Sequence, residues 1–212
     1  MLKTERMDRV RAALRAQGLT QMIVCDPKSV WYLTGVAVEP YERLLALYLP
    51  TEGEPVLFLN RLFNVPEPPC RTVWHTDTDK PVAQIAEVVD AGKPLGIDKE
   101  WPAKFLIPLM ETHPGMQVVL SSDCVDDCRA CKDAEEQALM REASRINDAV
   151  NEAAKHYIKA GMTEREVAEF IDAQFRAHGC EGPSFTTIVS FGANTADPHH
   201  ETDSYLVCRL LL

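Results

Sequence analysis

The sequence contains no long apolar run and no excess of positive charge. Its first seven residues lack the apolar core of a signal peptide, and no run approaches the roughly 20 apolar residues of a membrane-spanning helix. The 22 Lys and Arg residues are outnumbered by 32 Asp and Glu residues, which gives a formal net charge of -10. Nucleic acid and anionic membranes both require a basic face. These absences predict a cytoplasmic protein that binds neither of them.

A cysteine framework, an internal repeat and a low-complexity segment are also missing. The seven cysteines are odd in number and scattered, so we expect reduced thiols rather than a disulfide scaffold. What is present is an ordinary globular composition, with 46% hydrophobic and 25% charged residues. A length of 212 residues is enough for one large domain or two modest ones.

Residues 1–122 alternate between helix and strand patterns, and we expect them to form an α/β domain. The turn sequence at 51–54 predicts a hairpin between two of the strands. Helical spacing of apolar residues predicts helices near 7–17, 82–91 and 101–111. Apolar runs predict strands at 21–26, 44–49, 55–59, 71–75, 95–98 and 117–120.

Residues 123–212 differ in character, and we expect a second domain there. Residues 123–160 are almost wholly helix-forming, with Lys132-Asp133 as a joint between two helices. Thr163-x-x-Glu166 is a capping box that opens another helix, which Gly179 ends. An apolar run from Phe185 predicts a strand.

The step Pro198-His199-His200 is the main candidate for chemistry. The apolar run before it passes through Gly192 and Asn194, which suit a tight turn, and Pro198 restricts the backbone just before His199. Such a rigid approach suits an imidazole that meets a substrate. Two solvated histidines on a surface turn are the alternative interpretation, and local context alone does not choose between them.

Several motifs in the same order resemble the creatinase/aminopeptidase P/prolidase family of pita-bread metallopeptidases. The first, 31–35, is similar to the Tyr-Leu-Thr-Gly signature of that family's N-terminal domain. Residues 129–135 are similar to the Arg-x-x-Lys-Ser-x-x-Glu stretch that opens its catalytic domain. The remaining matches are the segments 161–167, 182–189 and 192–194 and the step Pro198-His199.

The resemblance implies a fold, a reaction and a site. The fold is a creatinase-like mixed-sheet α/β domain followed by an α+β pita-bread domain. The reaction is cleavage of an N-terminal residue ahead of proline, so the substrate is a peptide with proline at its second position. Members use two divalent metal ions (Mn, Co or Zn) held by two Asp, one His and two Glu. His199, with His200 as the fallback, matches the histidine that contacts the substrate or the intermediate. The N-terminal domain implies a homodimer.

The sequence departs from this family where the metal ligands are expected. In the family they follow the Pro-His step, but residues 204–212 contain no Asp, Glu or His. We therefore expect a truncated member with no metal site, inactive by itself, whose incomplete second domain leaves apolar surface exposed. A non-catalytic protein-binding or oligomerisation module is the alternative function.

Two further patterns allow both a functional and a structural interpretation. The spacing Cys124-x-x-x-Cys128-x-x-Cys131 matches the iron–sulfur motif of radical S-adenosylmethionine enzymes, but it also places three thiols on one helical face. We favour the helix face. Trp31, Tyr32 and Leu33 line either a pocket or the core, and we favour the core. The isolated His75, His113, His156 and His178 are expected to be structural or solvated.

Overall fold

The computed structural model describes residues 3–183 and 185–196. The chain divides into two compact units, Met1–Lys132 and Asp133–Leu212. This division lies further along the chain than the expected boundary at residue 122. The reason is helix α5 (Asp123–Ala130), whose buried Cys124 and Val125 belong to the hydrophobic core of the first unit.

A mixed six-stranded sheet forms the centre of the described part of the first unit, in the order β4-β3-β2-β1-β5-β6. Strand β2 is antiparallel to β1 and β3, while β1, β5 and β6 are mutually parallel and β4 is parallel to β3. Every strand except β2 therefore ends at the same edge of the sheet. The strands are β1 (Gln21–Val24), β2 (Ala46–Pro50), β3 (Val56–Asn60), β4 (Arg71–His75), β5 (Leu95–Ile97) and β6 (Val118–Leu120).

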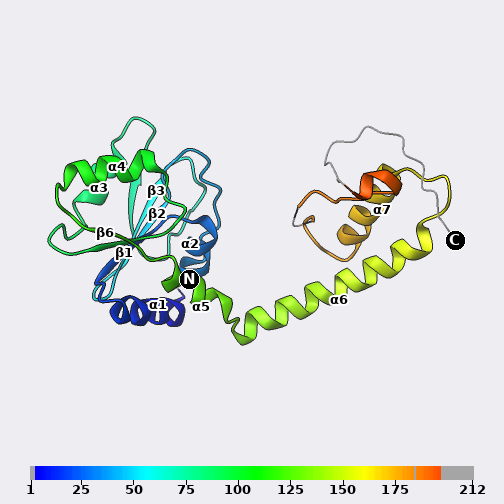
Figure 1. Cartoon of the computed structure of the whole chain (residues 1–212), viewed down its shortest axis with the longest axis horizontal. Helices are drawn as coiled ribbons and strands as arrows, with labels where there is room; N and C mark the ends of the chain where they lie inside the picture. The colour runs from blue at the N-terminus through cyan, green and yellow to red at the C-terminus, as the bar shows by residue number, and fades with distance from the viewer. Residues whose placement is uncertain (1–2, 184, 197–212) are drawn as a thin grey trace. The chain divides into compact units, whose positions relative to one another are not determined.

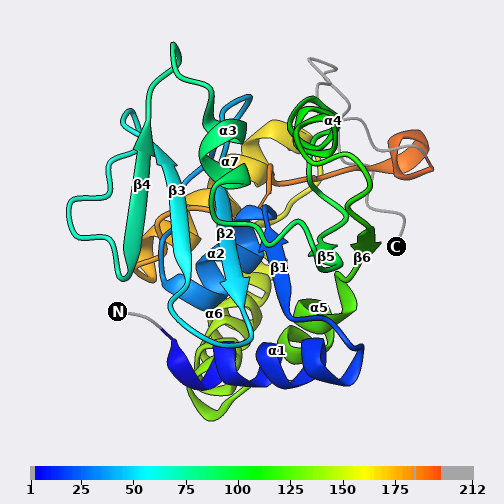
Figure 2. The ribbon, with the colours of Figure 1, turned by 90° about the vertical axis from the view of Figure 1, so that its left-hand side faces the viewer.

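Helices cover both faces of this sheet, as Figures 1 and 2 show. Helix α1 (Thr4–Ala16), α2 (Pro27–Thr34) and α5 pack with Met22 and Val24 in one core, and α3 (Pro81–Ala86) and α4 (Ala103–Thr112) pack with Ile23 and Cys25 in the other. Because successive side chains of a strand point to opposite faces, β1 contributes alternately to the two cores. The expected α/β layer domain is thus confirmed.

The second unit contains α6 (Ala134–Tyr157), α7 (Glu164–Ala177) and the short 3-10 helix η1 (Gly192–Thr195). Both α6 and α7 begin with capping boxes, Asp133 with Glu136 and Thr163 with Glu166. The rings of Tyr157 and Phe170 stack with centroids 3.8 Å apart. The joint at Lys132-Asp133 and the capping box at Thr163 therefore form as their sequences predict.

The expected strand from Phe185 does not form in the described residues, and that prediction was wrong. Residues 186–190 are without regular secondary structure. A strand needs a neighbouring strand for its backbone hydrogen bonds, and this segment instead contacts side chains of α7, where Thr187 donates to Asp172. The apolar composition of the segment does not specify whether it pairs with a strand or packs on a helix.

Helix α2 was missing from the sequence-based expectations although its signals are present. Asp26 is the N-cap and accepts hydrogen bonds from the backbone N–H groups of Lys28 and Ser29, and Pro27 is the first helical residue. Gly35 ends the helix with a φ of 76°, in the left-handed region that suits glycine. Eight residues are too few for apolar periodicity to be read reliably.

Apolar side chains are exposed in both units, and Leu62 and Leu120 are examples in the first. Leu139, Met140 and Phe185 have 65%, 57% and 69% of their surface exposed. In the described residues no helix combines the length and the apolar character that crossing a membrane requires.

Limited proteolysis tests which residues of the chain form the boundary between the two units. We expect a protease of broad specificity to cut between residues 131 and 133 first, since Cys131 and Lys132 are exposed and lie between α5 and α6. The stable product, identified by mass spectrometry, should end near Lys132. A product ending near residue 122 would show that α5 does not belong to the first unit.

Candidate functional site

The candidate residues His199 and His200 lie outside the residues that the structure describes. The described chain reaches Ala196, so the nearest described structure is the loop that precedes them in sequence. Phe191 and Asn194 of this loop both donate hydrogen bonds to the carboxylate of Glu164 on α7, from the backbone N–H at 2.7 Å and from the side-chain amide at 3.2 and 3.1 Å. Hydrogen bonds therefore attach the loop that precedes the candidate histidines in sequence to helix α7.

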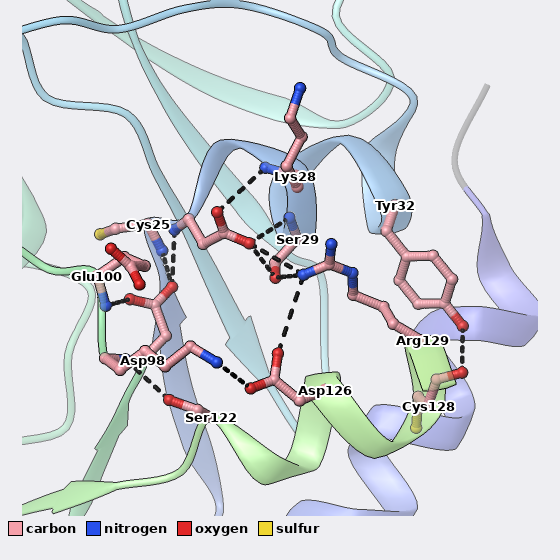
Figure 3. A network of polar contacts seen from close by, with 12 residues as sticks. Cys25, Lys28, Ser29, Tyr32, Asp98, Glu100, Ser122, Asp126, Cys128 and Arg129 are labelled. Carbon is pink, nitrogen blue, oxygen red and sulfur yellow. Dashed lines mark hydrogen bonds and ion pairs between the residues drawn. The ribbon is translucent and has the colours of Figure 1, made fainter. Parts of the chain in front are cut away.

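A second group of polar side chains lies in the first unit, where β1 and β5 end (Figure 3). The carboxylate of Asp98 accepts hydrogen bonds from the backbone N–H groups of Cys25, Asp26 and Glu100. Burial raises the pKa of Asp98 above its ordinary value, although these three donors oppose the shift. Asp98 thus joins the ends of two neighbouring strands.

Asp26 connects this edge of the sheet to α5. Its carboxylate caps α2, accepts a hydrogen bond from the Ser29 hydroxyl at 2.6 Å, and pairs with the guanidinium of Arg129 at 3.1 Å. Partial burial raises the pKa of Asp26, but hydrogen bonds from Ser29 and Lys28 and the charge of Arg129 outweigh it and lower the pKa. These hydrogen bonds and the ion pair with Arg129 stabilise the ionised form of the Asp26 carboxyl.

Tyr32 makes another link to α5. Its hydroxyl donates to the backbone carbonyl of Cys128 at 3.1 Å and accepts from Arg9 at 2.8 Å. Tyr32 and Leu33 are buried, as expected, but Trp31 is 54% exposed, so the core interpretation was wrong for that residue. Its position on the outer face of α2 explains this difference.

A cleft of about 280 Å³ lies where β3 and β4 end. Its polar side chains are bonded to one another: Arg43 forms two hydrogen bonds to Asp77, at 2.9 Å each, and Asn60 donates to Asp77 at 2.8 Å. His75 is buried, and its Nε2 lies 3.1 Å from the carbonyl of Leu44. Because a carbonyl can only accept, His75 donates from Nε2 to the carbonyl of Leu44.

The three cysteines of the helix face at α5 differ in their exposure. Cys124 is buried in the core, Cys128 is half-buried and Cys131, the C-cap residue, is exposed. Burial raises the pKa of Cys124 to about 11. In the part of the chain that the structure describes, no three His, Cys, Asp or Glu side chains come together in a way that could hold a metal ion. The described residues therefore do not fit a two-metal centre.

Comparisons with known proteins identify the family. Residues 6–131 match the Creatinase/Prolidase N-terminal domain, and residues 138–209 match metallopeptidase family M24. The chain belongs to the creatinase/prolidase family of pita-bread metallopeptidases. Its first unit is the creatinase-like domain, and its second unit is the first part of a pita-bread domain.

Individual relatives agree with this assignment. A probable dipeptidase PepE from Mycobacterium tuberculosis is 30% identical over 198 residues, and an uncharacterized peptidase from Staphylococcus epidermidis is 27% identical over 194 residues. These matches cover 89% and 90% of this chain but 52% and 55% of the relatives. The chain thus spans about half the length of these curated relatives.

Solved structures show the same fold. Dipeptidase PepE from Mycobacterium ulcerans matches 97% of this chain and 57% of its own with a TM-score of 0.84 at 27% identity. A prolidase from Thermococcus sibiricus matches 99% of this chain and 59% of its own with a TM-score of 0.85 at 26% identity.

Replacing Asp26 tests the network that Figure 3 shows. We expect Asp26→Ala to lower the free energy of unfolding at pH 7 by about 1–2 kcal/mol, because it removes the cap of α2 and the partner of Arg129. The pKa of Asp26 is lowered by folding, so its stabilisation is present above the ordinary carboxyl pKa and is lost as pH falls through the folded value. Urea unfolding of both proteins between pH 7 and pH 3 should show their difference shrinking below about pH 4.

Asp26→Asn is the matched control, because asparagine caps a helix about as well as aspartate but carries no charge. Asp26→Asn should keep most of the stability at pH 7. The difference in free energy of unfolding between Asp26→Asn and Asp26→Ala should stay constant between pH 7 and pH 3. A constant difference between wild type and Asp26→Ala across this range would contradict the ionic contribution.

Thiol labelling tests the structural interpretation of the α5 cysteines. With iodoacetamide and peptide mapping, Cys131 should react first and Cys124 only when the protein unfolds, because the thiolate is the reactive form and burial raises the pKa of Cys124. Protection of Cys131 that a chelator releases would instead indicate a bound metal.

Proposed function

We propose that this chain is the N-terminal part of an Xaa-Pro aminopeptidase-like or dipeptidase-like metallohydrolase, which removes an N-terminal residue that precedes proline. The observation that carries the proposal is the order of the two family matches along one chain, together with relatives named as dipeptidase and prolidase. The substrate is a peptide with proline at its second position.

In this proposal His199 is the catalytic residue of the chain, with His200 as the fallback. Its imidazole donates a hydrogen bond to the substrate or to the tetrahedral intermediate, where a fixed donor stabilises developing negative charge. The loop held by Glu164 supports this role, because it fixes the chain a few residues before Pro198 and His199. A cytoplasmic homodimer that associates through the first unit completes the proposal, and the acidic composition is compatible with it.

In this proposal the chain of 212 residues does not catalyse the reaction by itself. The described residues hold no cluster that fits a metal, and residues 204–212 contain no Asp, Glu or His. Carboxylate and imidazole ligands are what a dimetal hydrolase requires. The proposal assigns the ligand set to the part of the longer relatives that this chain does not match.

A non-catalytic binding or oligomerisation module is the second candidate. The exposed Leu139 and Met140 on α6 favour it, since apolar side chains on a helix surface commonly meet another protein. This candidate predicts association of the purified chain without any turnover.

Complementation separates the two candidates. Residues 1–203 are fused to the part of the Mycobacterium tuberculosis PepE sequence that lies beyond its matched half, and the product is assayed with Mn²⁺ on Xaa-Pro dipeptides. The fusion should hydrolyse them, while the chain of 212 residues shows no turnover. His199→Ala in the fusion should lower kcat by about 100-fold, the typical loss of one transition-state donor.

His113→Ala is the control, because His113 lies in the first unit with its Nε2 3.1 Å from the carbonyl of Ala86. An active fusion in which His199→Ala has no effect would remove His199 from the mechanism. A folded fusion without activity would favour the binding module.

A further inference from the structure

Cys128 and Cys131 lie one helical turn apart at the end of α5. The helix ends at Ala130, and Cys131 is its C-cap residue. The Cα atoms of residues three apart in an α-helix are separated by about 5 Å, and the Cα of a C-cap residue still follows the helix. Disulfides join residues whose Cα atoms are about 4.4–6.8 Å apart. The backbone spacing of this Cys-x-x-Cys pair therefore suits a disulfide.

The backbones of the two cysteines are held differently. The carbonyl of Cys128 accepts the hydroxyl of Tyr32, and the next residue, Arg129, pairs with Asp26, as Figure 3 shows. Cys131 is exposed and has the extended angles φ -92° and ψ 99°. Cβ atoms three apart within a helix are about 5–6 Å apart, whereas a disulfide brings them to about 3.5–4.5 Å. Because Cys131 is past the last helical residue, its backbone can turn to close this gap.

Cys124 does not compete for the same partner. It lies four residues before Cys128 inside the regular helix, so neither backbone can turn without breaking helical hydrogen bonds. Only 1% of its surface is exposed, and burial raises its pKa to about 11. Burial also raises the pKa of Cys128, which is half-buried. A small reagent in solution therefore meets Cys131 first, with Cys128 behind it as the second thiol.

We propose that Cys128 and Cys131 form a reversible dithiol–disulfide pair that responds to low-molecular-weight disulfides of the glutathione class. The thiolate of Cys131 attacks one sulfur of glutathione disulfide, which forms a mixed disulfide and releases one glutathione thiolate. The thiolate of Cys128 then attacks the sulfur of Cys131 and releases the second glutathione. Two cysteine thiols are thus oxidised, and one glutathione disulfide is reduced to two thiols that take up both protons.

The position of the pair gives this reaction a consequence for the chain. Cys131 and Lys132 are exposed and lie between α5 and α6, where the two units of the chain divide. A disulfide attaches Cys131 to the last turn of α5 and restricts the local opening that a protease requires. An exposed bond that needs a backbone adjustment is readily reduced, which is typical of regulatory disulfides. The inference is independent of the proposed peptidase activity.

Mass spectrometry of the full chain tests the linkage. The protein is equilibrated with reduced and oxidised glutathione at several ratios, quenched with iodoacetamide, denatured and digested with trypsin. Trypsin cuts after Arg129 and Lys132, so a disulfide joins the peptide 130–132 to the peptide that contains Cys128. Fragment ions of the joined peptides distinguish Cys128 from Cys124. We expect Cys128 to be the partner of Cys131, and dithiothreitol to separate them.

Limited proteolysis of the same samples tests the consequence. Cleavage between residues 131 and 133 should be at least about threefold slower in the oxidised chain than in the reduced chain, because the disulfide opposes local opening. Dithiothreitol should restore the faster rate. In Cys128→Ser the rate should not respond to glutathione disulfide, and Cys131 should keep a bound glutathione because the second thiol is missing. Cys70→Ser, which removes another half-buried thiol of the first unit, is the matched control and should behave like wild type.

Each alternative result for the wild-type chain would overturn the inference. Cys131 that carries glutathione alone, or stays unmodified, would show that Cys128 does not reach it. A bond from Cys131 to Cys124, or to a second copy of the chain, would assign it another partner. A bond between Cys128 and Cys131 that leaves the cleavage rate unchanged would remove the effect on the boundary between the units.

Discussion

A buried carboxylate that accepts backbone N–H groups is the interaction on which the arrangement of the first unit depends. Asp98 follows β5 and bonds to the two residues that come directly after β1, so it joins parallel strands at the point where their ladder ends. The backbone donors there would otherwise be buried without partners, which costs free energy comparable to a lost hydrogen bond. Asp26 can cap α2 in this position because its own N–H is held by Asp98.

A buried carboxylate that accepts a backbone N–H group is also found in the second unit. Glu164 is buried, as Asp98 is, and satisfies a backbone N–H of a segment distant in sequence. In both cases the carboxylate orders a loop that has no strand partner. The two loops differ in where they lead: the loop after β1 continues into a helix of the first unit, whereas the loop after Phe191 continues in sequence toward Pro198 and His199. Each carboxylate therefore orders the loop whose donors it accepts.

Most regular elements were predictable from the sequence because they depend on local periodicity, and the short helix α2 is the exception. All six apolar runs of the first unit form strands, and the capping box at Thr163 starts α7 where expected. The segment from Phe185 failed because strand formation depends on a partner, and its own residues do not specify one. Glu164 was not predicted to matter, since an acidic residue in the first turn of a helix is ordinary and its burial depends on Phe191 and Asn194, some 30 residues away.

The polar side chains at the edge of the sheet where β1, β3, β4 and β5 end also show why a cluster of polar groups does not by itself identify a binding site. Parallel strands that end at one edge often hold a ligand there. In this unit the corresponding groups are hydrogen-bonded to one another, as Arg43, Asp77 and Asn60 are in the cleft beside β3 and β4. A ligand would have to replace these bonds with others of equal strength, so binding would gain little.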